Sequence, residues 1–81
     1  MDESVTNEEK IDTLHDIAMN NGEDFRNDYS GRGMFGDECV GIVTDYPNTI
    51  IELAVEAGVK GARTDSMGRS TIVYWPSLIV S

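Results

Sequence analysis

The chain has 81 residues, of which 15 are acidic and six are basic, and its formal net charge at pH 7 is −9. This length predicts one domain, residues 1–81, around one small core, and the acidic balance excludes direct binding of DNA or RNA, because phosphate binding needs a basic surface. The only cysteine, Cys39, excludes a disulfide framework and a cysteine-rich metal site.

The first predicted element is a helix over about residues 7–20. Thr6 and Glu9 have the spacing of a capping box, which marks a helix start. Asn20-Asn21-Gly22 predicts the end of the helix. Residues 1–6 are expected to be flexible. The apolar stripe at helical spacing consists of Ile11, Leu14, Ile17 and Ala18.

Residues 22–37, GEDFRNDYSGRGMFGD, show no clear period and contain four glycines. The segment therefore predicts a long loop, and such loops in small domains are usually functional or disordered. Its apolar and aromatic side chains predict partial packing against the core; these are Phe25, Tyr29, Met34 and Phe35.

The remaining chain predicts strands on either side of a second helix. Residues 38–44 are rich in β-branched side chains and predict a strand. Pro47 predicts a helix start, Thr49 and Glu52 repeat the capping spacing, and Gly58 predicts the end. The helix, about residues 47–57, is apolar around much of its circumference and should be well buried. Residues 61–65 and 69–75 predict a hairpin with Gly68 in its turn.

The C-terminal residues and the order of the predicted elements complete the expected fold. Pro76 predicts the end of the last strand, because proline cannot donate to a ladder, and residues 77–81 predict an edge strand or a strip laid against the core. The elements alternate as α-β-α-β-β, and the strand, helix and strand suggest a right-handed crossover. We expect an α+β domain with a mostly antiparallel sheet of about three strands and a helix packed on it.

The acidic residues are concentrated in the first third of the chain. Residues 1–28 hold nine acidic and two basic residues, a net charge of −7. Glu8, Asp12 and Asp16 lie four apart on the face of the first helix away from its apolar stripe, and we call them the acidic row. Like charges at this spacing repel by a few tenths of a kcal/mol per pair.

The spacing of the acidic row suggests a surrogate for a nucleic-acid backbone. Residues four apart advance about 6 Å along a helix axis, which is close to every second phosphate of one DNA strand at about 3.4 Å each. Adaptation to high salt and a solvated helix face are the competing interpretations. The rest of the predicted negative partner-binding surface consists of Glu9, Glu23, Asp24 and Asp28, together with Asp2 and Glu3.

The segment Gly31-Arg32-Gly33-Met34-Phe35-Gly36 has three interpretations. Its Gly-x-Gly pair could cradle a phosphate, but it is not a Walker sequence and has no strand-turn-helix context. Arg32, Met34 and Phe35 are of types enriched at interface centres, so the loop is a second candidate partner surface. The third interpretation is ordinary core packing.

The sequence predicts no enzyme, no metal and no cofactor. His15 beside Asp12 and Asp16 lacks a third strong ligand, so a surface histidine is expected. Cys39 opens a strand without a neighbouring histidine and predicts a structural thiol. Ser66 has no base to activate it.

In its small size, its acidic surface and its lack of a catalytic set, the chain resembles the phage-encoded small acidic anti-CRISPR proteins of the DNA-mimic type. The resemblance implies binding to a CRISPR effector complex and occlusion of its DNA-binding groove. The N-terminal residues lack the features of a signal peptide and no run reaches membrane-spanning length, so we expect a cytoplasmic, soluble monomer or weak dimer.

The alternative function is a small acidic adaptor or regulatory module. It would dock on a basic protein through the first helix and the Met34-Phe35 loop. A DNA mimic competes with DNA for its partner, whereas an adaptor leaves the partner's DNA affinity unchanged.

Overall fold

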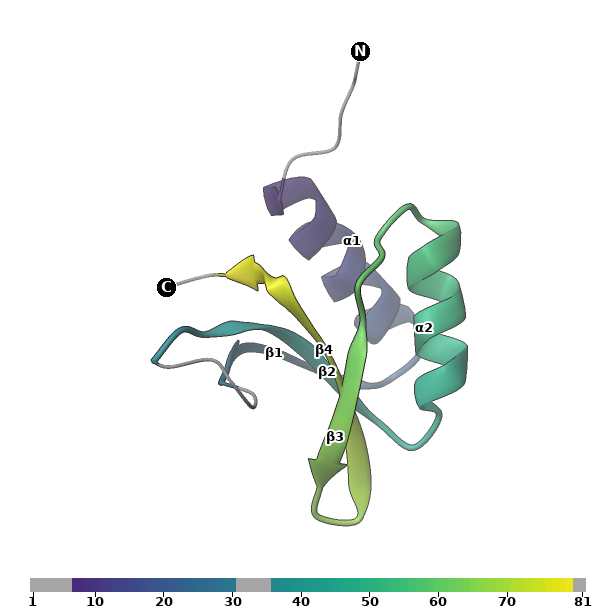
Figure 1. The fold of residues 1–81 in the computed structure, drawn as a ribbon. Helices are drawn as coiled ribbons and strands as arrows, with labels where there is room; N and C mark the ends of the chain where they lie inside the picture. The colour runs from purple at the N-terminus through teal and green to yellow at the C-terminus, as the bar shows by residue number, and fades with distance from the viewer. Residues whose placement is uncertain (1–6, 31–35, 80–81) are drawn as a thin grey trace.

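The computed structural model describes residues 7–30 and 36–79, which form two helices and a four-stranded antiparallel sheet (Figure 1). This confirms the predicted α+β class, with one strand more than expected. The elements are α1 (Asn7–Asn20), β1 (Asp24–Tyr29), β2 (Cys39–Thr44), α2 (Pro47–Glu56), β3 (Arg63–Met67) and β4 (Ser70–Ile79).

The strands are arranged in the order β1-β2-β4-β3, so β1 and β3 are the two edges. Because β2 and β3 both pair antiparallel with β4, they run parallel to each other with β4 between them. The segment β2-α2-β3 is therefore a crossover connection, as the sequence suggested. Strand β4, the second strand of the β3–β4 hairpin, lies between β2 and β3.

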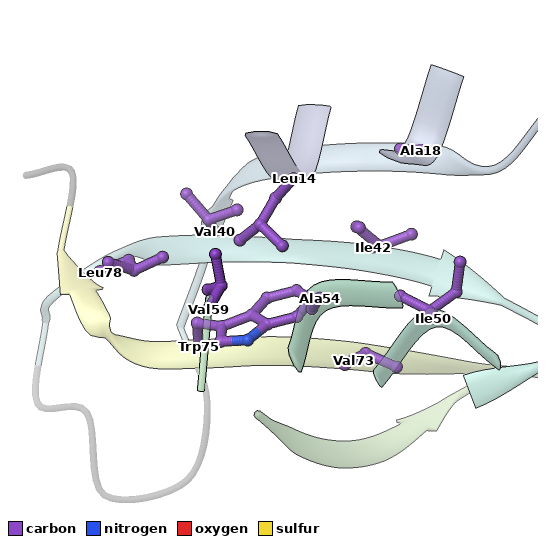
Figure 2. Close-up of a cluster of buried hydrophobic side chains, with 10 residues drawn as sticks. All are labelled: Leu14, Ala18, Val40, Ile42, Ile50, Ala54, Val59, Val73, Trp75 and Leu78. Atoms are coloured by element: carbon purple, nitrogen blue, oxygen red, sulfur yellow. The ribbon is translucent and has the colours of Figure 1, made fainter. Parts of the chain in front are cut away.

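Both helices contribute to one core on one face of the sheet. Leu14 and Ala18 of α1 and Ile50 and Ala54 of α2 contact the inward side chains of β2 and β4 (Figure 2). Trp75 is the largest fully buried side chain of this core. The buried residues of this helix-side core are Leu14, Ala18, Val40, Ile42, Ile50, Ala54, Val59, Val73, Trp75 and Leu78.

The prediction of a loop over residues 22–37 is wrong for its first part, because Asp24–Tyr29 is strand β1. Phe25 is paired with Ile42 and packs against the helix-side core, whereas Tyr29 is paired with Cys39 and packs on the other face. A register shift between Arg26 and Tyr29 breaks the alternation. The strand therefore lacks the period-2 pattern by which sequence analysis detects strands.

The prediction that Pro76 ends the last strand is also wrong, because β4 continues to Ile79. Val40 pairs with Trp75 while its neighbour Cys39 pairs with Ile79, so the extra residues of β4 form a bulge. Pro76 lies in that bulge, where its missing N–H interrupts no ladder bond.

Helix α2 begins and ends as its glycine and proline predict. Pro47 occupies the first turn, and Gly58 has a φ of +89° that favours glycine. The predicted capping pair Thr49 and Glu52 is wrong, because the helix begins earlier and its N-cap, Tyr46, makes no side-chain capping bond. The helix is also less buried than expected: Ile50 and Ala54 are buried, but Val55 is 45% exposed.

Candidate partner-binding surface

The acidic row lies on the exposed side of α1. Leu14 and Ala18 are fully buried beneath the helix, and Glu8, Asp12 and Asp16 are exposed. The buried face therefore fixes the rotation of the helix about its axis, and the three carboxylates project from a packed backbone. Within the described residues, no ion pair engages any of the three, so their charges face solvent.

A contact between two rings joins α1 to β1. The His15 and Phe25 ring centroids lie 4.9 Å apart with the planes at 86°, the edge-to-face geometry that aromatic pairs prefer. His15 is exposed, as predicted, and its ring contacts that of Phe25. Nowhere in the described parts of the chain do three or more potential ligands gather as a metal site would require.

Glu23 differs from the other predicted surface acids because it is turned towards the protein. Its Oε2 accepts a hydrogen bond from the hydroxyl of Thr44, which is 2% exposed. The same hydroxyl oxygen accepts the backbone N–H of Tyr46 at 2.9 Å. Glu23 thus ties the start of β1 to the junction between β2 and α2.

The other predicted acids are divided between two sides of the molecule, because Glu9 lies on α1 with the acidic row and Asp24 lies on β1. Glu9, Asp24 and Asp28 are all exposed. Asp24, however, is paired with Val43, which packs on the face of the sheet opposite the helices. The acidic row and Asp24 therefore lie on opposite sides of the sheet. The second predicted surface, Arg32, Met34 and Phe35, lies outside the described residues, as does the Gly31-Arg32-Gly33 segment.

A second apolar cluster lies on the face of the sheet away from the helices. Its buried members are Cys39, Ile72 and Tyr74, which we call the outer cluster. Tyr29 packs against it, with the Tyr29 and Tyr74 ring centroids 5.0 Å apart. The partly buried hydrophobic side chains packed on the outer cluster are Tyr29, Val43 and Met67.

A hydrogen bond between the two edge strands crosses the outer cluster. The hydroxyl of Tyr29 on β1 donates to Oδ2 of Asp65 on β3 at 3.1 Å. Burial, the hydrogen bond to Asp65 and the negative charge of that carboxylate raise the pKa of Tyr29 to about 12. Burial also raises the pKa of the Cys39 thiol, against the smaller effect of a hydrogen bond with the Trp75 backbone. The predicted structural role of Cys39 agrees with this buried position.

The described residues leave no pocket that could enclose a small ligand, and their helices are too short and too polar to cross a membrane. Comparisons of the chain with protein-family models, with curated proteins and with solved structures find no match.

Proposed function

We propose that the chain is a non-enzymatic inhibitor that binds the basic DNA-binding groove of a host defence complex, namely a CRISPR effector, and blocks its access to DNA. The observation that carries the proposal is the exposed acidic row on a helix whose other face is packed into the core. Such a partner would place the protein in the bacterial cytoplasm.

Preorganisation is the physical advantage of this arrangement. A carboxylate row on a packed helix loses little backbone entropy on binding, because the backbone is already ordered in the free protein. The charges also steer a basic groove towards the row and thereby raise the association rate. A partner that normally holds phosphates carries Lys and Arg side chains at suitable positions for these carboxylates.

The test compares two triple variants that carry the same net charge. Glu8→Gln, Asp12→Asn and Asp16→Asn neutralise the acidic row and change the net charge from −9 to −6. Asp37→Asn, Glu52→Gln and Glu56→Gln make the same change at exposed acids that are not part of α1. Each variant and the unmodified chain are titrated into purified CRISPR effectors that hold a fluorescent DNA duplex, and displacement of the duplex is measured.

We expect the unmodified chain and the control variant to displace DNA, and the acidic-row variant to associate at least tenfold more slowly. The difference should shrink at high salt, since the Debye length falls from about 8 Å at 0.15 M to about 3 Å at 1 M. Equal displacement by both variants would contradict a role for the row. Binding that leaves DNA in place would favour the adaptor function.

A further inference from the structure

The corner of the sheet that contains Tyr29 and Cys39 is held by interrupted ladders on both sides. The pairing of β1 with β2 shifts register between Arg26 and Tyr29, and the pairing of β2 with β4 shifts between Cys39 and Val40. Cys39 on β2 is paired with Tyr29 on β1 and with Ile79 on β4. A bulge in β1 and another in β4 therefore separate these three residues from the regular part of the sheet. Bulges disrupt the local ladder bonds, so this corner depends more on side-chain contacts than the centre of the sheet does.

The Tyr29–Asp65 hydrogen bond links this corner to the far edge of the sheet. Three strand spacings of about 4.8 Å separate the edge strands, so a flat sheet would hold β1 and β3 about 14 Å apart. The two residues are also offset along the strands, because Asp65 is aligned with Ile72 and Val43, whereas Tyr29 is aligned with Cys39. Side chains leave a sheet roughly perpendicular to it, so a 3.1 Å contact between these two requires the sheet to curl over the outer cluster.

The outer cluster is distinct from the helix-side core. The two groups of buried side chains share no member, because alternate residues of β2 and β4 point to opposite faces. Loss of contacts over Cys39, Ile72 and Tyr74 therefore removes nothing from the packing of α1 and α2 against the sheet. Exposure of the outer cluster therefore does not by itself require the helix-side contacts to break.

We propose that Tyr29 and Asp65 form a clasp that controls a local opening of the outer face, in which the Tyr29 end of β1 separates and the outer cluster becomes accessible to solvent. The clasp joins the two sheet edges, and its tyrosine ring lies on Tyr74. The hydroxyl of Tyr29 is protonated at neutral pH and donates to a carboxylate, so the bond is charge-assisted, and its length of 3.1 Å is at the long end for an O–H···O bond. The clasp belongs to a different face from the acidic row and does not depend on the proposed function.

Cys39 provides a direct measure of this opening, because it is the only cysteine of the chain and is fully buried in the outer cluster. The experiment measures its rate of modification by the thiol reagent DTNB at neutral pH over a series of low urea concentrations. Opening that is local exposes little surface and gives a rate that changes little with urea, whereas global unfolding gives a rate that rises steeply. The variants are Tyr29→Phe, which removes only the hydroxyl, and Tyr46→Phe, which makes the same change at a tyrosine that is 69% exposed.

We expect Tyr29→Phe to raise the labelling rate about tenfold, as loss of a hydrogen bond to a charged acceptor predicts, and Tyr46→Phe to leave it unchanged. Amide exchange at Leu14 in α1, which requires the helix layer to open, should report a larger opening free energy than the labelling of Cys39 in all three proteins. An unchanged labelling rate in Tyr29→Phe would overturn the proposal. A labelling rate that follows the urea dependence of global unfolding would overturn it as well.

The partner of the clasp gives an independent test. In the folded protein Oδ1 of Asp65 accepts a hydrogen bond from the backbone N–H of Ser66 at 2.8 Å. Asp65→Asn keeps the shape of the side chain and keeps an oxygen that can accept this bond. We expect Asp65→Asn to accelerate the labelling of Cys39, and the double variant with Tyr29→Phe to be no faster than Tyr29→Phe alone. If the increase in labelling rate in the double variant equals the product of the two single increases, the two side chains act independently. That result would contradict the proposed clasp.

Discussion

The side chain of Ile72 lies across the backbone of Gly41 on the neighbouring strand. A Cβ at position 41 would stand 2.9 Å from Cδ1 and 3.1 Å from Cγ1 of Ile72, and 3.3 Å from the carbonyl oxygen of Val73. Both residues are buried on the outer face. A glycine at this point is therefore needed for close packing between β2 and β4 and not for an unusual backbone angle.

Gly41→Ala should lower the free energy of unfolding by about 1–3 kcal/mol, the usual cost of an overpacked core. Urea denaturation measures this loss. Ile72→Val removes the Cδ1 methyl that the new Cβ would meet, so the double variant should lose less than the sum of the two single variants. Losses that simply add would contradict the contact.

The stability of the protein should fall at alkaline pH because of Tyr29. Tyrosine in the unfolded chain has a pKa near 10, whereas burial and Asp65 raise the pKa of Tyr29 to about 12. Between these values the unfolded chain releases the proton and the folded chain retains it, so the free energy of unfolding decreases as pH rises from 10 to 12. Below pH 10 the contribution is fully present.

Tyr29→Phe is the control for this pH dependence. The groups that act on Tyr29 are Asp65, Tyr74 and Cys39, and all three remain in the variant. The Cys39 thiol, whose pKa is also raised, contributes an alkaline loss to both proteins, so only the difference between them reports Tyr29. Parallel stability curves from pH 9 to 12 would contradict the prediction.

Helix α2 is anchored by Ile50, which is 1% exposed. Ile50→Ala should lower the free energy of unfolding by about 2–5 kcal/mol, because it leaves a cavity between the helix and the sheet. Val55→Ala on the exposed side of the same helix should change it by less than about 1 kcal/mol. Leu53 is half-buried, so the loss caused by Leu53→Ala should lie between those of Ile50→Ala and Val55→Ala. Thermal or urea unfolding of the three variants gives the order, and a similar loss for Ile50 and Val55 would contradict the packing of α2.

The hydroxyl of Thr44 should contribute to stability through two hydrogen bonds. Thr44→Val keeps the shape but leaves the N–H of Tyr46 and the carboxylate of Glu23 without this partner. The expected loss is about 1–3 kcal/mol, the cost of leaving buried polar groups unpaired. Thr13→Val is the matched control, because its hydroxyl donates only to the Glu9 carbonyl on the exposed surface of α1. Equal losses in urea denaturation would contradict a special role for Thr44.

Neutralising part of the acidic row should not destabilise the fold. Asp12→Asn and Asp16→Asn remove a repulsion worth a few tenths of a kcal/mol and leave Glu8 in the first turn, where a negative charge is favourable. The melting temperature of the double variant should be unchanged or slightly higher. A clear decrease would mean that the row stabilises the fold, and its loss of binding could then not be attributed to the partner surface.

The sequence alone determined the elements whose contacts are local. The apolar stripe of Leu14 and Ala18 defined the buried face of α1, and hence the exposure of the acidic row on the other side. Pro47 and Gly58 marked the limits of α2. These predictions succeeded because the helical period and the proline and glycine at the helix ends depend on residues a few positions apart.

Tertiary structure decided the features that depend on distant residues. Strand β1 forms because β2 supplies its partners, although Phe25 and Tyr29 point to opposite faces across a register shift. The hydrogen bond between Tyr29 and Asp65 joins side chains 36 positions apart. No period within one segment encodes that contact, since it arises only when bulges and strand twist curl the whole sheet.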